Sequence, residues 1–225
     1  MIIDCISDLH GHCPELEGGD LLIIAGDCTA NDKISQWHAF FMWLERQPYR
    51  KKVMVAGNHD GFCKNWAVAE TFTDAEYDQM YPGEKNSLDY LCDSGIEFEG
   101  LKIWGSPWTS PFYGQNPNCT GFTAPVDNSD EWLSKKWALI PQDTDILITH
   151  SPPYATLDGT VSNKRVGSSS LLCRKLSLKL NLHVFGHIHE GYGMDYHAQT
   201  HTTCVNASHV NERYEPVNKP VRIEL

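Results

Sequence analysis

Short apolar runs that lead into metal-binding residue types recur along this chain of 225 residues. The clearest run is Val184-Phe185, which is followed directly by Gly186-His187-Ile188-His189. A continuous apolar run of this length is typical of a strand that is buried on both faces. Four earlier runs lead in the same way into Ser7-Asp8-Leu9-His10, Gly26-Asp27, Gly57-Asn58-His59-Asp60 and Thr149-His150. Side chains that follow the ends of neighbouring strands can meet at one edge of a sheet, so the pattern predicts one site built from five distant segments.

The spacing of apolar residues between these signals predicts an α/β fold. Strands are expected over 1–7, 21–25 and 53–56, and a helix is expected from Ile34 to about Leu44, ended by Pro48. Further helices are expected over 74–80, after a helix cap at Ser129 or Asp130, and over 168–179. Short strands are expected at 96–98 and 101–104, joined as a hairpin, and at 146–148, 183–185, 203–206 and 221–224. With no repeat or linker in sight, one mixed α/β domain over 1–225 is the simplest expectation.

Charge and composition exclude several classes of function. The net charge of −11 argues against broad nonspecific binding of nucleic acid through a basic face. No apolar run approaches the roughly 20 residues that span a bilayer, and the first residues lack the basic start of a signal peptide. We therefore expect a cytoplasmic protein, in which the eight cysteines are free thiols. Cys28 follows Asp27 directly, and its role stays open.

The ligand types indicate which metals would bind. Aspartate, histidine and asparagine without cysteine suit a pair of divalent ions such as Mn, Fe, Zn, Ni or Co. Manganese is the leading choice because mixed oxygen and nitrogen ligands suit it. Asp8 and His10 are two residues apart, as are His187 and His189, so on extended strand ends each pair would point the same way. Gly26 allows close approach at Asp27.

In their order, the five signals resemble the calcineurin-like metallophosphoesterase superfamily. The segments 105–108, 145–153 and 182–193 are further similar to the MPPED-type metallophosphoesterase-domain proteins. The resemblance implies two packed mixed β-sheets flanked by helices, a four-layer sandwich. It also implies two metal ions, both bound by a bridging Asp27. One ion would further take Asp8, His10 and His189, and the other would take Asn58, His150 and His187.

The resemblance further implies phosphoester hydrolysis by a metal-bridging hydroxide. His59 would contact the phosphoryl group and protonate the leaving oxygen, which suits an imidazole near neutral pH. Asp60 would orient or charge-stabilise His59, or it would cap the following turn. The preferred function is a phosphodiesterase that acts on a small phosphate ester, with cyclic nucleotides among the candidates.

Three residues outside the motifs are candidates for substrate contact. His12 lies two residues after His10, and its alternative is an exposed loop position. Trp108, with Phe112 near it, could stack on a base or an aromatic leaving group, although core packing is the more common fate of tryptophan. Arg165, in the loop after His150, could meet a distal phosphate, or it could simply be solvated.

Two rival functions remain open. The first is a phosphomonoesterase, including a protein phosphatase. The arginines that clamp the phosphate in that branch have no equivalent after Asp60, where Gly61, Phe62 and Cys63 follow. The second is a non-catalytic scaffold on the same fold, which would not need the complete ligand set. The natural substrate, the native metals and the oligomeric state stay open.

Overall fold

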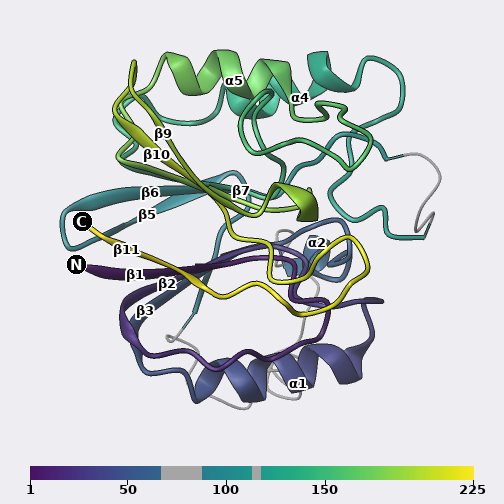
Figure 1. The fold of residues 1–225 in the computed structure, drawn as a ribbon, viewed down its shortest axis with the longest axis vertical. Coiled ribbons are helices and arrows are strands. Elements are labelled where there is room, and N and C mark those ends of the chain that lie inside the picture. The colour runs from purple at the N-terminus through teal and green to yellow at the C-terminus, as the bar shows by residue number, and fades with distance from the viewer. Residues whose placement is uncertain (67–87, 113–117) are drawn as a thin grey trace.

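The structure of this chain is a computed structural model that describes residues 1–66, 88–112 and 118–225. The helix expected over 74–80 lies outside the described residues. Two β-sheets pack face to face in the middle of the molecule, and helices cover their outer faces (Figure 1). Both ends of the chain lie at one end of this sandwich. The loops that follow the first three strands reach the opposite end.

The first sheet has the strand order β11-β1-β2-β3-β4. Its members are β1 (Ile2–Ile6), β2 (Gly19–Ala25), β3 (Tyr49–Val55), β4 (Asp89–Tyr90) and β11 (Val221–Glu224). β1 to β4 run parallel, with Cys5 opposite Ile23 in the register of β1 and β2. β11 closes the edge antiparallel to β1, so the sheet is mixed as expected.

The second sheet has the strand order β5-β6-β7-β8-β10-β9. Its members are β5 (Ser94–Phe98), β6 (Leu101–Ser106), β7 (Ile146–Thr149), β8 (Leu182–Phe185), β9 (Gly193–His197) and β10 (Thr202–Asn206). The four central strands are parallel, and β5 and β9 are antiparallel edges. The expected hairpin is confirmed, since β5 and β6 pair around Glu99 and Gly100, both of which have positive φ.

Alternation along the strands divides the core into layers. In β2, Leu21, Ile23 and Ala25 belong to the cluster that also holds Ile148 and Val184 of the second sheet. The intervening residues of β2 belong to a second cluster, with Trp37 and Phe40 of α1 (Ile34–Glu45). A third cluster joins the second sheet to α4 (Ser129–Trp137) and α5 (Ser169–Leu176). The sequence of helix, sheet, sheet and helices is the four-layer sandwich (Figure 1).

Both outer helices of the second sheet begin or end differently from the prediction. The N-cap of α4 is Asn128, with φ 57°, rather than Ser129 or Asp130. The Asp130 carboxylate instead accepts hydrogen bonds from the hydroxyls of Ser168 and Ser170 at the start of α5. α5 ends at Leu176, three residues early, where the Ser177 hydroxyl donates back to the Arg174 carbonyl and competes with the helical pattern.

Candidate metal centre

The loops after β1 and β2 continue side by side beyond the sheet. The backbone N–H of Asp8 donates to the carbonyl of Gly26 at 2.9 Å, and that of His10 donates to Asp27 at 3.0 Å. Asp8, His10 and Asp27 have left-handed backbones, with φ of 51°, 45° and 54°. Each such residue costs on the order of 1–3 kcal/mol, and strain of this kind gathers at functional sites.

The expected reason for convergence is therefore wrong, although the convergence itself is present. β1 ends at Ile6, so Asp8 and His10 meet through two left-handed turns and not through alternation along an extended strand. His187 likewise has φ 69°, and His189 begins the short 3-10 helix η1 (His189–Gly191). As a result, His187 and His189 join different groups of ligand atoms.

Glycine opens the space in which these side chains meet. A Cβ on Gly186 would lie 2.1 Å from Asp8 Oδ2, which no side chain could accommodate. A Cβ on Gly26 would lie 2.5 Å from His150 Nδ1, and Gly26 also has φ +96°. The close approach expected at Gly26 is thus observed, and it serves His150 as well as the Asp27 backbone.

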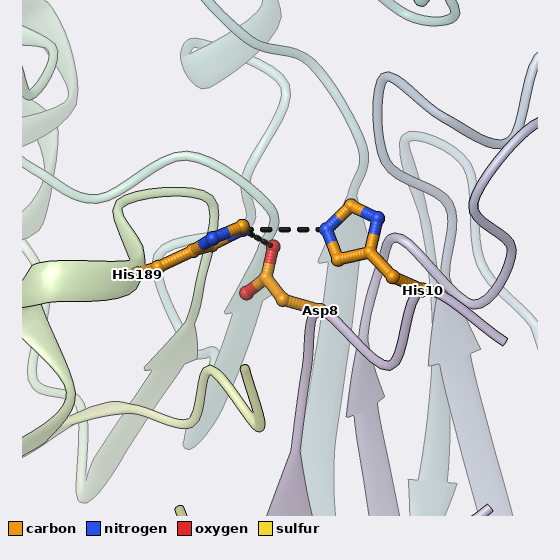
Figure 2. Close-up of side chains that lie close together, drawn as sticks. All are labelled: Asp8, His10 and His189. Atoms are coloured by element: carbon orange, nitrogen blue, oxygen red, sulfur yellow. Dashed lines mark hydrogen bonds and ion pairs between the residues drawn. The ribbon is translucent and has the colours of Figure 1, made fainter. Parts of the chain in front are cut away.

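Asp8, His10 and His189 form the first ligand group (Figure 2). His189 Nε2 lies 3.4 Å from Asp8 Oδ1 and 3.3 Å from His10 Nε2. Two ligand atoms bound at about 2.1 Å to one tetrahedral ion are roughly 3.4 Å apart. The spacing of these atoms therefore fits a shared divalent cation.

Asp27, His150 and His187 form the second ligand group. His150 Nε2 lies 3.4 Å from Asp27 Oδ1 and 3.2 Å from Asn58 Oδ1, so the asparagine oxygen joins this group. The other oxygen of Asp27, Oδ2, lies 3.7 Å from His10 Nε2 in the first group. The Asp27 carboxylate thus touches both groups, as a bridging ligand would.

Burial and charge prepare the side chains for a cation. Burial lowers the pKa of His10 to about 4, and burial with the charge of His150 lowers that of His187 to about 3. Both imidazoles are therefore neutral at neutral pH, which is the form that binds metal. Burial alone would raise the pKa of Asp8 and of Asp27, but the neighbouring histidines hold both below the ordinary value.

Backbone carbonyls fix which ring nitrogen faces the centre. His150 Nδ1 lies 2.7 Å from the carbonyl of Ala25, and His189 Nδ1 lies 3.1 Å from that of Asn211. A carbonyl can only accept, so each Nδ1 carries a proton and each Nε2 faces the centre. Although burial opposes the charged form, Asp27 raises the pKa of His150 to about 9 and Asp8 raises that of His189, so a cation that binds either Nε2 would have to displace a proton from it. This arrangement orients the two imidazoles, so the residues present fit a pair of bound divalent ions.

A model of calcineurin-like phosphoesterases matches residues 1–191. This chain belongs to the calcineurin-like phosphoesterase family. It is 38% identical to metallophosphoesterase domain-containing protein 1 of Homo sapiens, over 98% of this chain and 70% of that protein. A UPF0046 protein of Caenorhabditis elegans is 33% identical over 96% of this chain and 72% of its own length. One solved crystal structure superimposes with a TM-score of 0.65 at 16% identity, over 91% of this chain and 89% of the other, and shows the shared fold.

In this member of the family, His59 adjoins both ligand groups. Its backbone N–H donates to Asp27 Oδ1 at 2.8 Å, and its ring lies edge-on to His10 at a centroid distance of 4.5 Å. His59 Nδ1 lies 2.7 Å from the carbonyl of Ala30, so that nitrogen carries a proton and Nε2 is left for the site. The side chain is almost fully buried.

Asp60 is fully buried and holds backbone rather than substrate. Its carboxylate accepts hydrogen bonds from the N–H groups of Cys28, Thr29 and Gly57, at 3.0, 3.1 and 3.0 Å. It thereby ties the loop after β2 to the loop after β3. Of the two roles expected for Asp60, these contacts support the local structural one.

The three residues predicted to contact substrate, His12, Trp108 and Arg165, contact different neighbours and do not form one group. His12 is half-buried, and its ring lies 6.2 Å from that of His209. Arg165 Nη1 donates to the buried carboxylate of Asp158 at 2.9 Å, so its charge is compensated within its own loop.

Trp108 packs against the helical layer instead of the ligand groups. Its Nε1 donates to Asp93 at 2.8 Å, and its ring lies 4.8 Å from that of Trp132. The Nζ of Lys136 lies 4.4 Å from the centre of the Trp108 ring. These contacts support a packing role for Trp108 and do not support stacking on a substrate.

Two other aromatic residues lie closer to the ligands. The Phe112 ring is about half exposed and lies 6.4 Å from that of His187. The Tyr214 ring lies 4.8 Å from His10 and 5.2 Å from His189. The motifs did not predict Tyr214. The one hint in the sequence is that Tyr214 lies in the segment after a strand that ends at Asn206, as the ligand residues also follow strand ends.

A cavity of about 410 Å³ opens beside Asn58 and His59. Its walls are mostly polar, and they include amide, hydroxyl, carboxylate and ammonium groups: Asn31, Asp32, Asn58, His59, Gly61, Lys64, Asn118, Cys119, Thr120 and Gly121.

Proposed function

We propose that this calcineurin-like phosphoesterase is a dimetal phosphodiesterase, with cyclic nucleotides among its candidate substrates. The observation that carries the proposal is the meeting of seven ligand-type side chains at the strand ends, with His59 packed against them. Asp8, His10, Asp27 and His189 would hold one ion, and Asp27, Asn58, His150 and His187 the other. Manganese is the proposed activator, with Fe, Zn, Ni and Co as alternatives.

The bound ions would supply an activated water as nucleophile and would stabilise charge on the phosphoryl oxygens. The protein itself supplies orientation and a proton. Since Ala30 holds the His59 Nδ1 proton, Nε2 is the nitrogen free to act. A protonated Nε2 would deliver its proton to the leaving alkoxide oxygen, which is the role proposed for His59. The hydrogen bond from its N–H to Asp27 keeps His59 in register with the centre.

The arginines favour a diester over a monoester. A monoester carries close to two negative charges, and guanidinium groups that bind it in a bidentate manner are the usual complement. The chain has six arginines, all within the described residues. Four of them donate hydrogen bonds to groups outside the ligand set: Arg50, Arg165, Arg174 and Arg222. Arg213 Nε lies 3.6 Å from Glu212 Oε1, and Arg46 follows the last residue of α1, where its backbone N–H caps the helix.

Paired substrates test this choice. Bis(4-nitrophenyl) phosphate and 4-nitrophenyl phosphate share one leaving group and differ in the second ester. We expect a higher kcat/KM for the diester in the Mn²⁺-loaded protein. If the monoester is faster, the phosphatase alternative replaces the diesterase. If neither is turned over with two ions bound, the scaffold alternative replaces both.

The setting proposed for this activity is the cytoplasm, with the residues 1–225 acting as one domain. All eight cysteines are free, which suits a reducing compartment. None of the helices in the described residues is long and apolar enough to cross a membrane. The proposed partner is a small phosphate ester, and the net charge of −11 opposes broad binding of nucleic acid.

A further inference from the structure

A loop near the C-terminus crosses the first ligand group. This loop, here the C-terminal loop, runs over residues 206–218, from the end of β10 toward β11. It lies beyond residues 1–191, the part that the family model matches. Three of its residues contact Asp8, His10 and His189, the three members of that group.

Ser208 determines which oxygen of the Asp8 carboxylate is open to a cation. Its buried hydroxyl donates to Asp8 Oδ2 at 2.7 Å, and the backbone N–H of His187 donates to the same oxygen at 2.9 Å and to Oδ1 at 3.1 Å. A hydroxyl has one proton, and a charged carboxylate is a stronger acceptor than the Asn206 amide oxygen, which lies 2.8 Å away. Oδ2 therefore receives the Ser208 hydroxyl as well as the His187 N–H, whereas Oδ1 receives only a share of that N–H. Oδ1 is thus the more open oxygen for a cation, and it lies 3.4 Å from His189 Nε2.

Asn211 and Tyr214 hold the two imidazoles. The carbonyl of Asn211 accepts from His189 Nδ1 at 3.1 Å. The Tyr214 ring meets both His10 and His189 edge to face, with interplanar angles of 85° and 88°. One aromatic ring therefore restricts the rotation of both imidazoles.

The C-terminal loop is itself held in shape. The side-chain oxygen of Asn211 accepts the N–H groups of Arg213 and Glu215, at 2.9 and 3.0 Å. His209 and Asn218 bond across the base of the loop, with His209 Nδ1 2.8 Å from the Asn218 carbonyl. Within this frame Tyr214 has φ 62°, an unusual value for a large side chain. The frame maintains a strained backbone that brings the ring over the ligands.

The second ligand group has a different outer shell. His150 is oriented by the carbonyl of Ala25, and the Asn58 amide donates to the carbonyl of Cys119 at 3.2 Å. These partners belong to β2 and to the segment after residue 117. Apart from Asp27, which touches both groups, and the His187 N–H, which donates to Asp8, the two ligand groups are supported by different parts of the chain.

We propose that the C-terminal loop is a positioning element for one of the two metal positions and sets its affinity independently of the other. The inference rests on the dimetal centre of the proposed function. Ser208, through Asp8, and Tyr214, through His10 and His189, are its positioning residues. Removing an outer-shell partner typically weakens metal binding by about 10- to 100-fold.

The test is calorimetric titration of metal-free protein with Mn²⁺, with bound metal counted after gel filtration. For Ser208→Ala we expect one binding step to weaken about 10- to 100-fold and the other to change less than about 2-fold. Ser208→Thr keeps a hydroxyl and should restore the first step. Ser134→Ala, which removes an exposed hydroxyl on α4, is the matched control and should leave both steps unchanged.

Tyr214→Ala gives an independent reading if Ser208→Ala does not fold. It should weaken the same step, whereas Tyr196→Ala, at an exposed position on β9, should weaken neither. Three outcomes would each overturn the inference and leave the dimetal centre intact. The two binding steps could weaken equally, or binding could be unchanged. The metal-free variant could also show a loss of Tm large enough to account for the weaker binding. A wild-type protein that binds no Mn²⁺ would instead remove the proposed function, and the inference with it.

Discussion

The backbone N–H of His59 donates to Asp27 Oδ1 at 2.8 Å, so the proposed acid and the proposed bridging ligand are joined directly. The bond links the loop after β3 to the loop after β2. A change at Asp27 should therefore affect both metal positions and the placement of His59 together.

Replacing Asp27 with Asn should disturb both metal positions. The amide keeps the size of the side chain, but it loses the charge and one of the two acceptor oxygens that touch His10 and His150. Elemental analysis of metal-replete wild type should give close to two ions per chain, and Asp27→Asn should give clearly fewer. Full loading of Asp27→Asn would contradict the bridging role.

Metal should also stabilise the fold. The buried Asp27 carboxylate lies 3.7 Å from His10 Nε2 and 3.4 Å from His150 Nε2, a cluster that forms only in the folded state, so a cation bound there stabilises that state alone. At a free metal concentration of 100 Kd, each site adds about 2.7 kcal/mol, which is roughly 5–10 °C in Tm for a chain of this size. Calorimetric melts with Mn²⁺ and with EDTA measure the difference. Equal melting temperatures at saturating Mn²⁺ would rule out binding at this centre.

His59→Ala should lower kcat by about 10²–10⁴ with metal content nearly unchanged, because the side chain acts on charge that develops as the leaving group departs. The loss should be smaller for a nitrophenolate leaving group than for an alkoxide, since nitrophenolate needs less protonation. His38→Ala, on the exposed face of α1, is the control. Equal losses on both substrates would mean that His59 binds the phosphoryl group without donating a proton.

Trp108→Ala should act on stability and leave KM alone. The substitution removes the ring that packs on Trp132 and the hydrogen bond to Asp93. We expect a loss of about 3 kcal/mol, the lower end for Trp→Ala in a core, because Trp108 is only half-buried. Urea unfolding measures the loss, and Trp108→Phe should recover part of it. An unchanged unfolding midpoint with a raised KM for aromatic diesters would restore the stacking role.

The meeting of the ligand-type residues could be predicted because their signal is local. The seven residues follow five apolar strands, and Asp27 or His187 is recognisable from a few neighbouring residues. Their backbone conformation could not be predicted, since left-handed Asp8 and His10 depend on hydrogen bonds to the loop after β2. The same holds for Asp60, whose three N–H partners come from two separate loops.

The surroundings of the site depend on contacts across long stretches of sequence. Trp108 is followed by a loop-like run of Pro and Ser, yet its neighbours Asp93 and Lys136 come from other elements and place it in the packing. Tyr214 has no motif, and it reaches His10 only because β10 and β1 lie in adjoining sheets. Side chains whose role depends on such tertiary neighbours leave no pattern in the sequence around them.

The pairing of β11 with β1 means that the first sheet cannot be completed until the end of this chain has been synthesised. β1 precedes both of its partners and can pair early with β2, but its other edge must wait for Val221, the partner of Cys5. Until then a nascent chain exposes an unpaired apolar edge, the kind that joins to other chains. Contacts of such long sequence separation also slow folding. Rapid early capture of that edge by a chaperone would therefore matter more for this chain than for one whose first strand pairs only with the second.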